Sequence, residues 1–83
     1  MSRPAIRVYS RPGCHLCEQL LEELLPLLRG RADVEVLDID ARSEWALAYG
    51  TRIPVVELDG EFLCQFHLDA AAVTTALERR GIR

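Results

Sequence analysis

The sequence contains no lysine, no long apolar run and no cluster of basic residues. Its ten basic residues are all arginines scattered along the chain, thirteen acidic residues outnumber them, and the net charge is −3 at pH 7. This charge balance argues against a nucleic-acid groove. The longest apolar runs, such as residues 70–73, fall far short of the roughly 20 residues that a membrane span needs. The sequence therefore predicts neither nucleic acid nor a membrane as a partner.

The N-terminus also lacks a signal for secretion. Its first ten residues, MSRPAIRVYS, contain no apolar segment of the kind found in a signal peptide, so we expect a cytoplasmic protein. The 83 residues allow one domain, residues 1–83. Their composition, 49% hydrophobic and 28% charged, is typical of a globular chain. We expect this domain to fold by itself as a monomer.

Only three cysteines are present, Cys14, Cys17 and Cys64. An odd number in a small chain without a secretion signal argues against a disulfide scaffold. It indicates redox or metal chemistry instead.

Four segments have the pattern of β-strands: residues 6–9, 34–39, 55–58 and 61–65. Residues 34–39 are apolar on both faces, which predicts an inner strand joined to the first strand by a right-handed parallel crossover. Asp59-Gly60 separates the last two segments, and a two-residue loop of this kind predicts an antiparallel hairpin.

The first of three helical segments carries leucines along one face. This stripe consists of Leu16, Leu20, Leu21, Leu24, Leu27 and Leu28. Pro26 lies on the opposite face, where we expect it to kink the helix or to close its last turns before Gly30.

Two shorter helices complete the pattern. Residues 43–49 predict a short helix with Ser43 as its N-cap and Gly50 as its end. Residues 69–80 predict the last helix, which Gly81 ends. The order β-α-β-α-β-β-α predicts an α/β fold with a mixed four-stranded sheet.

The segment Cys14-His15-Leu16-Cys17 stands where the first strand passes into the first helix. The unpaired amides and the positive end of a helix N-terminus stabilise a thiolate, and they lower a thiol pKa from its ordinary value of about 8.5. Cys17 falls inside the leucine stripe, whereas Cys14 falls at its edge beside the turn. The pattern predicts that Cys14 is the attacking thiol and Cys17 the resolving one.

Two cations lie close to this segment in the sequence. A charged His15, or Arg11 three residues before Cys14, would favour the thiolate. The alternative is that both are solvated surface residues, because adjacency in sequence does not determine where a side chain points.

The sequence contains YSRPGCHLC, then Ile53-Pro54, and then Asp59-Gly60 ahead of a final helix. In this order, these motifs resemble those of the glutaredoxin-like members of the thioredoxin-fold superfamily. The order and spacing match from residue 6 to residue 81. The resemblance implies a thioredoxin fold, a thiol-disulfide oxidoreductase acting in cell redox homeostasis, and no bound cofactor. It implies protein or small-molecule disulfides as substrates and glutathione as a candidate reductant.

The resemblance also implies roles for three residues. The peptide bond before Pro54 would be cis and Pro54 would face the dithiol, while the backbone of Ile53 would bind the substrate. Arg11 would meet a carboxylate of glutathione. The chain departs from the family at His15-Leu16, where Pro-Tyr is usual, and at residues 64–69, where a Gly-Gly usually lets glutathione approach the backbone.

Two other functions are compatible with the same residues. A metal site is one of them, because the sequence contains a Cys3His set with paired spacings typical of zinc ligands: Cys14, Cys17, Cys64 and His67. An iron–sulfur cluster is a related alternative. A binding module that keeps the fold without catalysis is the other alternative, although the intact dithiol argues against it.

Overall fold

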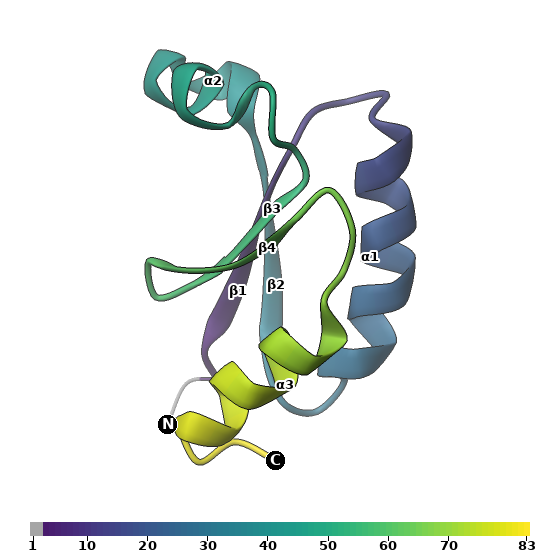
Figure 1. The fold of residues 1–83 in the computed structure, drawn as a ribbon, viewed down its shortest axis with the longest axis vertical. Coiled ribbons are helices and arrows are strands. Elements are labelled where there is room, and N and C mark those ends of the chain that lie inside the picture. Colours follow the sequence, from purple (N-terminus) through teal and green to yellow (C-terminus); the bar gives the residue numbers. More distant parts are fainter. Residues whose placement is uncertain (1–2) are drawn as a thin grey trace.

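The structure, a computed structural model, describes residues 3–83 as a four-stranded sheet with helices on both faces (Figure 1). In chain order the elements are β1 (Ala5–Ser10), α1 (His15–Leu28), β2 (Asp33–Asp38), the 3-10 turn η1 (Ile39–Ala41), α2 (Ser43–Tyr49), β3 (Val55–Leu58), β4 (Glu61–Gln65) and α3 (Ala70–Arg79). The strands lie in the order β2-β1-β3-β4. β1 and β2 are parallel and the other pairs are antiparallel, which confirms the predicted mixed sheet.

The main core lies between one face of the sheet and the helices α1 and α3. Leu20, Leu24 and Leu28 of the predicted leucine stripe are buried there, against β1 residues such as Ile6 and Val8. Leu25, which the periodicity places outside the stripe, is 54% exposed. The stripe therefore attaches α1 to the sheet and determines where the start of this helix lies.

A smaller core lies on the opposite face of the sheet, under α2 (Figure 1). The ring of Tyr9 stacks on Tyr49, with centroids 4.1 Å apart, and meets Trp45 edge to face at 5.6 Å. Ile39 and Val55 complete this cluster. Because Tyr9 stands near the C-terminal end of β1, α2 covers the same end of the sheet from which α1 begins.

The prediction that residues 34–39 form an inner strand is wrong, because β2 lies at one edge of the sheet. The parallel crossover places β2 beside β1 as expected, but the β3–β4 hairpin adds to the other side of β1. Val34 and Leu37 are apolar because they pack on the cores of opposite faces, not because strands flank them on both sides. Val36, in the middle of the strand, is 52% exposed.

The helix ends agree with the sequence except at one cap. The side chain of Asp69 caps α3 by accepting a hydrogen bond from the Ala72 N–H at 3.0 Å. Ser43 was predicted to cap α2, but it is the first helical residue. Arg42 holds the extended cap conformation and makes no side-chain cap bond. Because the N-cap position falls on Arg42, whose side chain has no hydrogen-bond acceptor, the first turn of α2 has no side-chain cap.

The two predicted turn features are also present. Asp59 and Gly60 both have positive φ, 50° and 82°, as a tight two-residue hairpin loop requires. Pro26 lies exposed in the last turn of α1, which continues to Leu28 and is followed by Gly30 with φ 77°. No helix among residues 3–83 combines the length and the apolar character needed to cross a bilayer.

Candidate functional site

Cys14 and Cys17 form a disulfide at the N-terminus of α1, with their Cα atoms 5.2 Å apart. Cys14 is the N-cap residue of the helix, and its Sγ accepts a hydrogen bond from the Cys17 N–H at 3.2 Å. A turn brings Cys14 to this position, because its own N–H donates to the Arg11 carbonyl at 3.2 Å. Gly13 in this turn has φ 78°, a conformation that glycine adopts without steric cost.

The two sulfurs differ in accessibility. Cys14 is partly exposed, whereas Cys17 is 2% exposed and faces the core side of α1. When the disulfide is reduced, a thiolate at Cys14 would have the Cys17 N–H and the positive end of the helix beside it. Cys14 is thus the more accessible residue of the pair, and the attacking and resolving roles of the two cysteines stay predictions.

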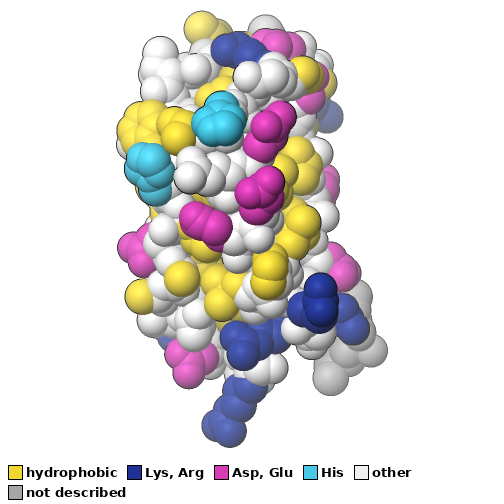
Figure 2. Space-filling model, turned by 90° about the vertical axis from the view of Figure 1, so that its right-hand side faces the viewer, with side chains coloured by type: hydrophobic (Ala, Val, Ile, Leu, Met, Phe, Trp, Pro, Cys, Tyr) yellow, Lys and Arg dark blue, Asp and Glu magenta, His cyan; other side chains and the backbone are white. Residues whose placement is uncertain are grey.

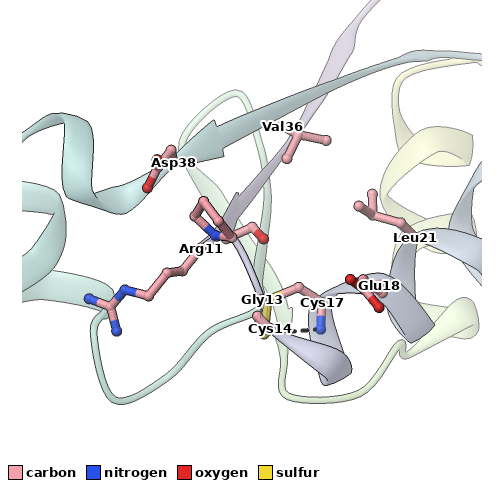
Figure 3. A pocket seen from close by; sticks show the side chains of 10 residues that line it. Arg11, Gly13, Cys14, Cys17, Glu18, Leu21, Val36 and Asp38 are labelled. Carbon is pink, nitrogen blue, oxygen red and sulfur yellow. Dashed lines mark hydrogen bonds between the residues drawn. A yellow bond between two sulfur atoms is a disulfide. The ribbon is translucent and has the colours of Figure 1, made fainter.

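Arg11 makes an ion pair with Asp40, a residue of η1. Its Nε and Nη2 donate to the two carboxylate oxygens at 3.1 and 3.0 Å, which raises the pKa of the guanidinium. The side chain therefore extends away from Cys14 (Figure 3). His15, in contrast, is the exposed first residue of α1, and its imidazole makes no hydrogen bond or ion pair within the described part of the chain. Of the two predicted cations, only His15 is placed on the helix that carries the cysteines.

Pro54 lies at the same end of the sheet as the cysteines. Tyr9 of β1 pairs with Val55 of β3, and one residue beyond that pair stand Ser10, which leads to the cysteine turn, and Pro54. The Ile53–Pro54 peptide bond is cis. Pro54 is buried, and Ile53 is partly buried against the small aromatic core.

A cavity of about 290 Å³ adjoins the disulfide on the side of β2 (Figure 3). Its lining includes Cys14, Cys17 and Leu21 on the side of α1 and Val36 on β2. The sequence offered no signal for this cavity, because it depends on β2 being an edge strand.

Residues 5–78 match the family described as Glutaredoxin-like domain (DUF836). The chain belongs to this family. The uncharacterized protein Rv0508 of Mycobacterium tuberculosis is 33% identical over 66 residues, which cover 72% of this chain and 68% of that protein.

Solved structures support the same assignment for this glutaredoxin-like domain. The solution structure of protein Ne2328 from Nitrosomonas europaea is 29% identical, with a TM-score of 0.81, and the match covers 92% of this chain and 93% of that one. A mutant thioredoxin from Halobacterium salinarum is 25% identical, with a TM-score of 0.63, over 94% of this chain and 74% of that one. The thioredoxin fold and the Cys14–Cys17 pair together support a thiol redox function for the glutaredoxin-like domain.

The glutaredoxin-like domain has an unusual backbone conformation where the family usually has Gly-Gly. Phe66, in the loop after β4, has φ 67°, which is uncommon for a bulky residue, and its side chain is 38% exposed. Its N–H donates to the Pro54 carbonyl at 2.9 Å, so this loop is attached to the segment that enters β3. Phe66 was not singled out from the sequence, because nothing in the residue type indicates a positive φ.

The third cysteine lies apart from the disulfide. Cys64, on β4, is a free thiol with 6% exposure in the main core, opposite Val56. His67 is exposed in the next loop. Within residues 3–83 no group of three or more His, Cys, Asp or Glu side chains is placed to hold a metal ion, so the proposed Cys3His set is not assembled.

Cys64 should therefore react slowly with alkylating reagents in the reduced, folded protein. Burial raises the pKa of its thiol, which lowers the thiolate fraction near neutral pH and moves the rise in reactivity to higher pH. We expect alkylation by iodoacetamide to be about a hundredfold slower than in the urea-unfolded chain. Mass spectrometry of each cysteine peptide measures this ratio, and equal rates in the two states would contradict the buried position.

Proposed function

We propose that this glutaredoxin-like domain is a thiol-disulfide oxidoreductase that reduces disulfides with the Cys14–Cys17 pair. The observation that carries this proposal is the placement of a partly exposed Cys14 at the N-cap of α1, bonded to a buried Cys17 one helical turn away. A dithiol of this kind exchanges with a substrate disulfide through a mixed disulfide.

The reaction begins with the reduced dithiol. The Cys14 thiolate attacks one sulfur of the substrate disulfide, the substrate S–S bond breaks, and the other substrate sulfur leaves as a thiolate that takes a proton from solvent. Cys17 then loses its proton and attacks the Cys14 sulfur, which releases the second substrate thiol. The substrate gains two electrons and two protons, and the protein is left with the Cys14–Cys17 disulfide. A thiol reductant restores the dithiol.

Other residues of the site have supporting roles in this proposal. Pro54 and the backbone of Ile53 help to shape the surface on which the substrate lies, and His15 favours the Cys14 thiolate when it is charged. Glutathione is the candidate reductant. To bind a glutathione carboxylate, Arg11 must first break its ion pair with Asp40. An exposed ion pair of this kind contributes at most about 1 kcal/mol to stability, so breaking it costs little. The proposed setting is the cytoplasm, with the protein acting as a monomer in cell redox homeostasis.

Trapping of the mixed disulfide tests the mechanism. Cys17→Ser leaves Cys14 able to attack but removes the resolving thiol, so we expect nearly one equivalent of substrate to remain bound to Cys14. The reduced variant is mixed with a disulfide-containing protein such as oxidised insulin, quenched with acid, and analysed by mass spectrometry before and after treatment with a reductant.

The double variant Cys14→Ser, Cys17→Ser is the matched control, because it keeps Cys64 and removes the proposed nucleophile. It should capture no substrate. A binding module without catalysis predicts no adduct in the Cys17→Ser variant either, and that outcome would refute the proposed function.

A further inference from the structure

The cavity beside the disulfide is an apolar groove lined in part by the two cysteine residues. Its lining includes Leu21, Val36 and Pro12, together with Cys14 and Cys17. Val36 is 52% exposed in the middle of β2, whereas other apolar strand residues such as Ile6, Val8 and Val56 are buried in the main core. The groove therefore leaves apolar surface open to water directly next to the reacting atoms.

The rim of this groove is acidic. Glu18 and Asp38 line it, both are exposed, and neither makes an ion pair within residues 3–83. One carboxylate oxygen of Asp38 accepts a hydrogen bond from the Asp40 N–H at 2.9 Å, which leaves the other oxygen for a ligand. Arg11 also lines it, but Asp40 already balances the charge of its guanidinium. Further acidic side chains continue along the outer face of α1, beside exposed hydrophobic side chains (Figure 2). A ligand that fits this rim carries positive charge.

The size of the groove limits what it holds. Its volume of about 290 Å³ lies at the lower end of the roughly 300–1,000 Å³ found for small-molecule sites, which suits one or two large side chains. Glutathione matches the groove poorly, because it has two carboxylates to face an acidic rim and no apolar side chain to fill the interior.

We infer that this groove binds the polypeptide that flanks the substrate cysteine, and that the preferred substrates are protein disulfides with an apolar residue next to the cysteine and an arginine or lysine just beyond it. This inference rests on the proposed function, because the segment is held while its cysteine is bonded to Cys14. The apolar neighbour fills the space between Leu21 and Val36, and the basic residue meets Glu18 and Asp38.

Exchange rates with short peptide disulfides test this specificity. The reduced protein is mixed with symmetric disulfides of Arg-Leu-Cys-Leu-Arg, Glu-Leu-Cys-Leu-Glu and Arg-Ser-Cys-Ser-Arg, with glutathione disulfide, and with the small neutral disulfide of 2-mercaptoethanol. We expect the Arg-Leu peptide to react roughly two- to fivefold faster than the Glu-Leu peptide at low salt, a preference that falls as salt is added. Its advantage over the Arg-Ser peptide should be about tenfold.

Variants of the protein test whether the groove causes these differences in peptide rate. For each variant, every peptide rate is divided by the rate for the small neutral disulfide. Val36→Ser should reduce the rate advantage of the Arg-Leu peptide over the Arg-Ser peptide. Leu47→Ser, at an 89% exposed position on α2, should leave this advantage unchanged. Glu18→Gln should reduce the rate advantage of the Arg-Leu peptide over the Glu-Leu peptide. Glu23→Gln, at an exposed position on the same helix but outside the groove, is its control.

The outcomes separate this inference from the proposed function. If none of the disulfides reacts, including the small neutral one, the oxidoreductase function itself is wrong. If all the peptides react at one rate, or if the groove variants behave like their controls, the protein exchanges disulfides but does not use this groove. A faster reaction with glutathione disulfide than with every peptide would identify glutathione as the preferred substrate and overturn the inference.

Discussion

Replacing Cys14 by serine should abolish disulfide reduction, with a loss of roughly 10³-fold or more in rate. The thiolate is the attacking species in disulfide exchange, and a serine hydroxyl at the same N-cap position does not ionise near neutral pH. The serine oxygen can still accept the hydrogen bond from the Cys17 N–H, so the start of α1 should keep its conformation. Reduction of insulin by dithiothreitol, followed as turbidity, measures the catalysed rate.

The Cys64→Ala variant is the control for this experiment. It also removes one of the three thiols, but from a buried position on β4, and should retain most of the activity. Activity in Cys14→Ser comparable to that of the unaltered protein would mean that another group carries out the attack.

Replacing Leu24 by alanine should cost about 2–5 kcal/mol of the free energy of unfolding. Leu24 is fully buried between α1 and the sheet, so the substitution removes apolar contacts and leaves a cavity in the main core. For a domain of this size such a loss is a large part of the total stability, which is about 5–15 kcal/mol for typical domains. Urea unfolding followed by far-ultraviolet circular dichroism measures the change.

The adjacent leucine supplies the matched control. Leu25→Ala makes the same chemical change on the same helix, but Leu25 is 54% exposed, so the free energy of unfolding should change by no more than about 0.5 kcal/mol. Equal losses in the two variants would contradict the orientation of α1 on the sheet.

Much of the fold could be predicted because its signals are local. The leucine stripe specifies which face of α1 is buried, and Asp59-Gly60 specifies a tight hairpin between β3 and β4. The placement of Cys14 at the start of α1 follows from the turn residues between β1 and this helix. Each of these features depends on residues within a few positions of one another.

The remaining features depend on contacts between distant parts of the chain. Whether β2 is an inner or an edge strand is decided by the side of β1 to which β3 adds, and the composition of residues 34–39 carries no information about that choice. Arg11 finds Asp40, which is 29 positions further along the chain, and is thereby turned away from Cys14. The left-handed conformation of Phe66 is likewise set by its surroundings, including the Pro54 carbonyl, and not by its own preference.

The edge position of β2 also bears on how the protein behaves at high concentration. An exposed edge strand is a template for sheet-to-sheet aggregation, because its unpaired backbone groups can bond to another chain. β2 carries exposed carboxylates at Asp33, Glu35 and Asp38. Asp33 and Glu35 form exposed ion pairs with Arg3 and Arg7, so a second strand that paired with this edge would have to displace or desolvate charged side chains, which disfavours growth of a joint sheet. The charged side chains along β2 thus oppose sheet-to-sheet association of two copies at this edge.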